Sequence, residues 1–210
     1  MVRAPDKQNL SIEGPAGMLE ALLEKPADRT FDRVAVLCHP HPRHQGTMYN
    51  KVVHTLARAM HDLGLATLRF NFRGTGASEG KYADGEGEID DVVAVVGYVR
   101  QSWPEAELWL GGFSFGAVVS ARAAHQLQPA RLISIAPAVN ILGRELADQP
   151  AMPWLIIQGD ADEVVPHEDV LEWLAALQTG PRLIVLKGVG HFFHGHLVEL
   201  RETLVEALSG

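Results

Sequence analysis

Short apolar runs recur along the chain, and stretches with helical periodicity separate most of them. These runs are almost continuously apolar, a pattern typical of strands that are covered on both faces of a parallel sheet. Strands and helices that alternate in this way predict an α/β fold, with a doubly wound, mostly parallel sheet and helices on both faces. The predicted strands comprise residues 34–38, 66–72, 108–110, 131–135, 154–157 and 183–186.

Apolar side chains recur with the period of a helix in the stretches between these strands. The first such stretch ends before Gly64, and glycine commonly follows a helix C-terminus. The second begins with acidic side chains, which favour a helix N-terminus. The predicted helices comprise residues 52–63, 89–99, 115–126, 170–178 and 196–208.

The first 25 residues depart from this alternation. Residues 10–13 and 18–23 are short strand-like runs, and the Gly14-Pro15-Ala16-Gly17 sequence between them is typical of a turn. We therefore expect a β-hairpin at one edge of the sheet. The sequence contains no internal repeat, low-complexity tract or linker, and its 210 residues suit one domain, so residues 1–210 are predicted to form a single domain.

Composition narrows the classes of partner. The formal net charge is -8 and neither Lys nor Arg clusters, which argues against a nucleic-acid partner and against an anionic membrane surface. The only cysteine, Cys38, cannot form a disulfide within the chain, as suits a reducing compartment. Residues 1–10 lack the apolar core of a signal peptide, and no apolar run approaches the roughly 20 residues that span a bilayer. We expect a cytoplasmic protein that does not bind membranes.

Two stretches match the pattern Gly-x-Ser-x-Gly, and their contexts differ. Gly76-Ala77-Ser78-Glu79-Gly80 is followed by polar and glycine-rich residues, so no helix is expected to start at Ser78. Gly112-Phe113-Ser114-Phe115-Gly116 follows a predicted strand directly and leads directly into a predicted helix. That context is typical of a nucleophile elbow, in which a tight strand-to-helix turn exposes the serine hydroxyl. Ser114 is therefore the predicted nucleophile.

A serine hydroxyl needs a general base, and the base needs an acid to orient it. Downstream of Ser114, one predicted strand is followed by Asp160 and Asp162, and the next is followed by His191. These side chains come after the carboxyl ends of strands, where open α/β sheets build their sites. A general base must be neutral, so we expect activity to rise with pH as His191 loses its proton.

The chain resembles the α/β-hydrolase superfamily, and within it the small, lidless bacterial serine hydrolases of esterase or dienelactone-hydrolase type. The resemblance extends from about residue 30 to the end and includes an Arg-Gly-x-Gly-x-Ser loop, here residues 73–78, which assigns Ser78 to a structural loop. The family's Gly-x-x-Asp-x-x-Val segment, here residues 159–165, favours Asp162 over Asp160 as the acid. The resemblance implies that Ser114 attacks a carbonyl carbon, His191 moves the proton, and Asp162 holds the imidazole.

An oxyanion hole needs two N–H donors. One is expected from the backbone of Phe115, the residue after the nucleophile, and the other from the loop at residues 39–44. Many relatives have glycine where this chain has Pro40, and neither Pro40 nor Pro42 has an N–H, so His41 is the expected second donor. The aromatic residues that flank the nucleophile and the base predict an apolar substrate pocket; they are Phe113, Phe192 and Phe193.

The remaining patterns favour a cofactor-free serine hydrolase. The two prolines restrict the geometry of His39, His41 and His44 as metal ligands, and no dinucleotide-binding or Walker pattern occurs, so neither a metal nor a cofactor is expected. Residues 136–153 are too few for a large lid, which favours small or extended soluble esters cleaved through an acyl-enzyme. The alternatives are peptidase, thioesterase or perhydrolase activity of the same triad, or a non-catalytic ligand-binding or scaffold protein.

Overall fold

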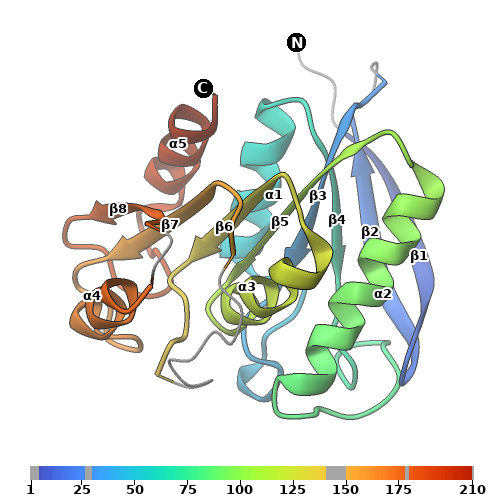
Figure 1. Ribbon diagram of the computed structural model, residues 1–210, viewed down its shortest axis with the longest axis horizontal. Coiled ribbons are helices and arrows are strands. Elements are labelled where there is room, and N and C mark those ends of the chain that lie inside the picture. The colour runs from blue at the N-terminus through green and yellow to red at the C-terminus, as the bar shows by residue number, and fades with distance from the viewer. Residues whose placement is uncertain (1–4, 27–29, 141–149, 178–179, 210) are drawn as a thin grey trace.

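The strands form one sheet of eight in a computed structural model, which describes residues 5–26, 30–140, 150–177 and 180–209. Their order across the sheet is β1-β2-β4-β3-β5-β6-β7-β8. From β4 to β8 all neighbours are parallel, and β2 pairs with β4 antiparallel (Figure 1). Parallel strands need crossover connections, and among the described residues helices provide those from β3 to β4, β4 to β5, β5 to β6 and β7 to β8. The mostly parallel, doubly wound sheet that the sequence predicts is therefore confirmed.

The predicted parallel strands are all present, but several have different ends. The bounds are β3 (Arg33–Cys38), β4 (Ala66–Phe70), β5 (Glu107–Phe113), β6 (Arg131–Ile135), β7 (Trp154–Gly159) and β8 (Arg182–Leu186). The prediction that β4 continues to residue 72 is wrong, because the Phe72 N–H donates to His39 Nε2 instead of to a strand. The prediction that β5 ends at residue 110 is also wrong. Gly111 and Gly112 pair with both β3 and β6, although glycine is rare in strands.

The predicted edge hairpin is confirmed, with longer strands than expected. It consists of β1 (Asp6–Gly14) and β2 (Gly17–Lys25), joined at a two-residue turn of Pro15 and Ala16. β1 lies at the edge of the sheet, and β2 connects the hairpin to β4.

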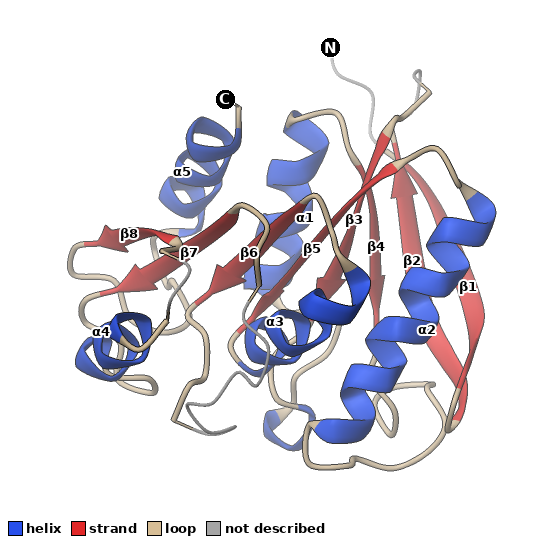
Figure 2. Ribbon diagram, viewed as in Figure 1, coloured by secondary structure: helices blue, strands red, loops and turns tan. Residues whose placement is uncertain are grey.

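Helices cover both faces of the sheet (Figure 2). α1 (Lys51–Asp62) and α5 (Leu197–Leu208) pack together on one face. α2 (Glu86–Ser102), α3 (Phe115–Leu127) and α4 (His167–Ala175) lie on the other. Their apolar sides form two buried clusters, one on each face of the sheet. The predicted helix over residues 170–178 is present with different ends, since α4 begins at His167, directly after Pro166, and ends at Ala175.

The carboxyl ends of the parallel strands β5, β7 and β8 point to the same side of the molecule. The loops that follow them there carry the predicted site residues. Only residues 136–153 connect β6 to β7, and residues 141–149 of this segment lie outside the described residues. No helix of the described ranges is long and apolar enough to cross a membrane.

Candidate active site

Ser114 occupies a strained turn between β5 and α3. Its φ of 56° and ψ of -116° are unfavourable for a residue with a side chain, and such strain is typical of active sites. Neighbouring backbone groups hold it there, because its N–H donates to Ile135 O and its carbonyl oxygen accepts from Ala117, Val118 and Ala138 N–H. The turn connects strand directly to helix, as the nucleophile-elbow interpretation of the sequence expects.

The two glycines of the motif are required by close packing. A Cβ at Gly112 would lie 2.4 Å from the backbone of Gly116, and a Cβ at Gly116 would lie 2.4 Å from His39 O. Real Cβ atoms do not approach other atoms so closely. The elbow can therefore pack against the end of β3 only because both positions are glycine.

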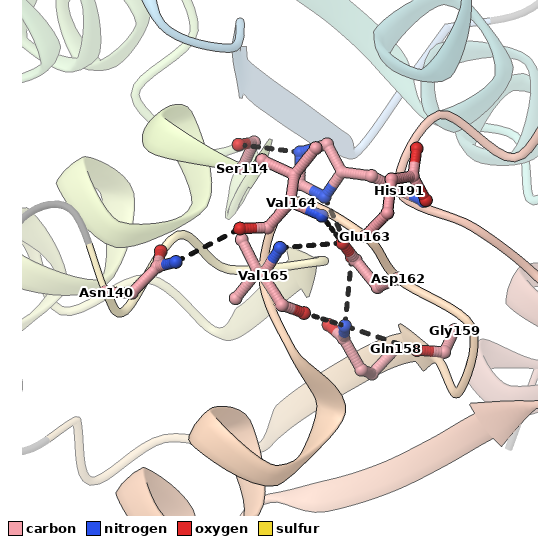
Figure 3. A network of polar contacts seen from close by, with 9 residues as sticks. All are labelled: Ser114, Asn140, Gln158, Gly159, Asp162, Glu163, Val164, Val165 and His191. Atoms are coloured by element: carbon pink, nitrogen blue, oxygen red, sulfur yellow. Dashed lines mark hydrogen bonds and ion pairs between the residues drawn. The ribbon is translucent and has the colours of Figure 1, made fainter.

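The structure brings Ser114, His191 and Asp162 into one chain of hydrogen bonds (Figure 3). Ser114 Oγ lies 3.0 Å from His191 Nε2, and His191 Nδ1 lies 2.8 Å from Asp162 Oδ2. All three residues are buried. With the proton on Nδ1, His191 donates to the carboxylate, and its Nε2 can accept the serine proton.

Asp162 is held as a carboxylate by several donors. Its Oδ1 accepts from the N–H groups of Val164 and Val165, at 2.9 and 2.7 Å. Burial acts to raise the pKa of Asp162, but the hydrogen bonds from His191 and from these N–H groups outweigh it and hold the pKa below its ordinary value. The other candidate acid, Asp160, is exposed and accepts from Gly188 N–H instead of contacting His191.

No motif in the sequence points to Gln158, the second-to-last residue of β7. Its side chain is fully buried, and Nε2 lies 3.0 Å from Asp162 Oδ2 and 3.2 Å from Val165 O (Figure 3). Because those atoms are acceptors, the amide nitrogen must face them. The signal that could have identified it is a polar side chain directly after a predicted buried strand and four residues before the candidate acid.

The loop after β3 lies against the start of α3, where the oxyanion donors are expected. The His41 ring packs 4.8 Å from the Phe115 ring, measured between centroids, and His41 Nε2 is 3.2 Å from the Tyr82 hydroxyl. Phe115 is the first residue of α3, and the first N–H groups of a helix have no acceptor within it. The two expected donors therefore come from adjoining segments.

The predicted pocket residues differ in exposure. Phe113 and Phe193 are fully buried, whereas Phe192 is 42% exposed. Phe113 packs against the His191 ring at a centroid distance of 5.0 Å, and Phe193 belongs to the apolar cluster beneath α1 and α5. Phe192 is therefore the one of the three whose side chain presents substantial surface.

The first Gly-x-Ser-x-Gly match lies in a structural loop. Ser78 Oγ donates to Asn71 O and accepts from Glu20 N–H, which ties the loop to the hairpin. Arg73 forms a buried ion pair with Asp91 of α2, and both the Arg73 side chain and its backbone N–H donate to that carboxylate. The next helix, α2, does not begin until Glu86.

His39 and Cys38 have structural surroundings. His39 Nε2 accepts from Phe72 N–H, so Nδ1 carries the proton that is donated to Pro40 O. Burial raises the pKa of the Cys38 thiol, which lies in the apolar core. In the part of the chain that the structure describes, no three His, Cys, Asp or Glu side chains are grouped closely enough to hold a metal ion.

The sheet, the elbow and the hydrogen-bonded serine and histidine are those of the α/β serine hydrolases. Within that class, the chain belongs to the family described as serine aminopeptidase, S33, whose profile matches residues 32–145. It is therefore a member of a hydrolase family, and the resemblance that the sequence motifs indicate is confirmed.

Solved structures and a sequence relative agree with this assignment. An α/β serine hydrolase homologue from Coxiella burnetii is 48% identical, with a TM-score of 0.91 over 96% of this chain and 97% of that chain. A serine hydrolase without lid from Xanthomonas campestris is 43% identical, with a TM-score of 0.90 over 97% and 94%. A protein of Rickettsia prowazekii is 32% identical over 94% of this chain and 87% of its own length.

Proposed function

We propose that the protein hydrolyses carboxylic esters, with Ser114 as nucleophile, His191 as general base and Asp162 as the acid that orients His191. The observation that carries this proposal is the chain of hydrogen bonds from Ser114 Oγ through His191 to Asp162 Oδ2. A buried, hydrogen-bonded serine, histidine and carboxylate in this order activate a hydroxyl that is otherwise a weak nucleophile.

The reaction has two halves. Ser114 Oγ attacks the ester carbonyl carbon while His191 Nε2 takes the hydroxyl proton, and the resulting oxyanion accepts hydrogen bonds from Phe115 and His41 N–H. The tetrahedral intermediate then expels the alcohol, which takes the proton from His191, and leaves an acyl-enzyme. Water repeats the attack with the same proton transfers, releases the carboxylic acid and restores the serine.

The expected substrates are small soluble esters. The short connection between β6 and β7 supports this, because it leaves little chain for a lid that would exclude water from a long-chain lipid site. The site is expected to need neither a metal nor an organic cofactor, since the proton transfers and the nucleophile all come from side chains of this chain.

The decisive test is intact-mass analysis after treatment with a fluorophosphonate, which forms a serine–phosphorus bond and releases fluoride. We expect one adduct, mapped to Ser114, and none on Ser114→Ala. We also expect Ser114→Ala to lower kcat for ester hydrolysis by at least about a thousandfold. Ser78→Ala is the matched control, because it alters the other Gly-x-Ser-x-Gly serine, and it should still be labelled. Absence of an adduct, or an adduct on Ser78, would favour a non-catalytic binding or scaffold protein.

Peptide hydrolysis is the second candidate, because the family profile carries the description of an aminopeptidase. The same three residues can cleave amides, so the esters that are assayed should be compared with amino-acid arylamides and with thioesters of the same acyl groups. We expect kcat/KM to be highest for the oxygen esters. Faster cleavage of the arylamides would instead assign a peptidase.

A further inference from the structure

A groove with a volume of about 300 Å³ lies beside His191, between the start of α1 and the segment that follows His191. We call it the His191-side groove; its lining residues are Thr47, Tyr49, Asn50, Lys51, Val52, Phe192 and His194. A larger groove, of about 690 Å³, lies between α1 and α5 and contacts none of the candidate catalytic residues. Neither groove is lined by Ser114, His191 or Asp162, but the smaller one is lined by Phe192, the residue that follows His191.

Two exposed aromatic rings line this groove. Tyr49 is 58% exposed and Phe192 is 42% exposed, and among the described residues they are the two aromatic members of the exposed large apolar side chains. They come from positions far apart in the sequence, and the fold brings them to the same groove. Exposed apolar side chains that gather at a concave site mark a binding surface more often than isolated ones do.

The groove is coupled to His191 through Phe192. The ring of Phe192 packs perpendicular to the His191 imidazole at a centroid distance of 5.1 Å, and it also packs 5.8 Å from the His194 ring. In the proposed function, His191 returns its proton to the leaving group, so the leaving-group oxygen must lie at His191 Nε2. Phe192 both lines the groove and packs on the His191 ring, so we expect a group that extends from that oxygen past Phe192 to enter the groove.

The charge of the lining favours an anion. Lys51 is the one lining side chain with a permanent charge at neutral pH, and among the residues that the structure describes its ammonium group has no ion-pair partner. Among the described residues, none that lines the groove carries a carboxylate. A negative substituent on a bound ring would therefore meet a cation and no opposing charge.

We propose that the His191-side groove binds the leaving group of the substrate, and that this leaving group is an aromatic alcohol carrying an anionic substituent. This inference rests on the proposed ester hydrolysis and adds to it the substrate class. Aromatic rings pack edge to face with other rings more favourably than saturated rings of the same size do. The rings of Tyr49 and Phe192 would pack against the ring of the leaving group, and the Lys51 ammonium group would attract its anionic substituent.

The test compares four acetate esters with matched leaving groups: benzyl, cyclohexylmethyl, para-carboxybenzyl and para-carbamoylbenzyl. Each kcat/KM is divided by the rate of alkaline hydrolysis of the same ester, so that intrinsic reactivity cancels. We expect benzyl acetate to exceed cyclohexylmethyl acetate by about fivefold. We expect the carboxylate to exceed the carboxamide by about threefold at low salt and to lose this advantage at high salt.

Substitutions separate the two preferences. Tyr49→Leu and Phe192→Leu keep an apolar side chain but remove a ring, and each should reduce the benzyl preference. Lys51→Gln should abolish the carboxylate preference and keep the benzyl preference. Lys25→Gln is the matched control. Lys25 is the last residue of β2 and lies near the amino end of β4, whereas the candidate site lies at the carboxyl ends of the parallel strands. Both preferences should persist in this variant.

Fluorophosphonate labelling of Ser114 in the same preparations distinguishes this inference from the proposed function. Labelled enzyme that hydrolyses all four esters with equal normalised kcat/KM would overturn the groove assignment and leave ester hydrolysis standing. Preferences that persist unchanged in the Leu and Gln variants would also overturn it. Absence of both labelling and hydrolysis would overturn both proposals.

Discussion

At the scale of single residues, the candidate acid depends on a neighbour that does not touch the nucleophile. Asp162 Oδ2 accepts from both His191 Nδ1 and Gln158 Nε2, while Oδ1 accepts from two backbone N–H groups. Each carboxylate oxygen thus accepts two hydrogen bonds, and a rotation of the carboxylate away from His191 would break them. Gln158 is fully buried and hydrogen-bonds to Asp162 and not to Ser114, so we propose that it is a positioning residue.

We expect Gln158→Leu to lower kcat by about tenfold with little change in KM, because a hydrogen bond to a charged group is lost while the substrate contacts remain. In Gln158→Glu, a carboxyl group would face Asp162, and it can donate only when protonated. The activity of that variant should therefore fall with rising pH where the wild type does not. The pH profiles of kcat, normalised to the fraction labelled by fluorophosphonate, measure this.

A purely structural role for Gln158 has a different signature. It would lower the free energy of unfolding and the labelled fraction, but would leave kcat per labelled site and its pH profile unchanged. That result in both variants would contradict a positioning role.

At the scale of elements, the loop that contains Ser78 is anchored to α2 by the Arg73–Asp91 pair. Asp91 is fully buried and Arg73 nearly so, and the Arg73 guanidinium donates from both Nε and Nη2. The same carboxylate also accepts from the Arg73 backbone N–H. One side chain of α2 thus determines the path of the loop after β4, which packs beside the end of β3 through His39 and Phe72.

We expect Asp91→Ala to lower the free energy of unfolding by about 3–5 kcal/mol, because it leaves a buried guanidinium without its partner. Glu86→Ala, on the same helix, is the matched control. Glu86 pairs with Arg122 at the surface and is largely exposed, so its loss should cost less than about 1 kcal/mol. Urea unfolding at neutral pH measures both, and equal midpoints for the two variants would show that the buried pair contributes little.

At the scale of the whole molecule, stability is tied to pH by buried neutral histidines. Burial lowers the pKa of His39 from 6.5 to about 4, although its hydrogen bond to Pro40 O opposes the shift. Burial also lowers the pKa values of His54 and His61. In each case the unfolded chain binds a proton more readily than the folded one, so acid favours unfolding.

We expect the His39 contribution to be complete above about pH 6.5 and to be lost progressively as the pH falls to about 4. A shift of this size corresponds to about 3 kcal/mol of unfolding free energy. Urea unfolding of the wild type and of His39→Asn, measured at several pH values across this window, should show a shallower pH dependence in the variant. His44→Asn, which removes an exposed histidine, should keep the wild-type slope. Parallel pH profiles for wild type and His39→Asn would contradict this explanation.

Local patterns in the sequence are enough to predict the order of the elements and the strand-to-helix turn at Ser114. The patterns used for these predictions are local: continuous apolar runs, helical periodicity and the context of the two Gly-x-Ser-x-Gly matches. They involve residues that are close in the sequence, so they can be recognised without the fold. They predict β6 without error and separate Ser114 from Ser78. They fail where pairing with distant strands overrides local propensity, as in Gly111 and Gly112 of β5.

Which side chains contact one another depends on how the loops fold. The residues alone leave Asp160 and Asp162 open, and the family resemblance favours Asp162; the folded loop turns Asp162 toward His191 and Asp160 toward Gly188. Gln158 reaches Asp162 because the loop after β7 folds back on the end of that strand, and the His191-side groove joins residues 47–52 to residues 192 and 194, which are distant in the chain. Such contacts depend on the paths of loops, and loop paths are set by packing and hydrogen bonds that no single stretch of sequence contains.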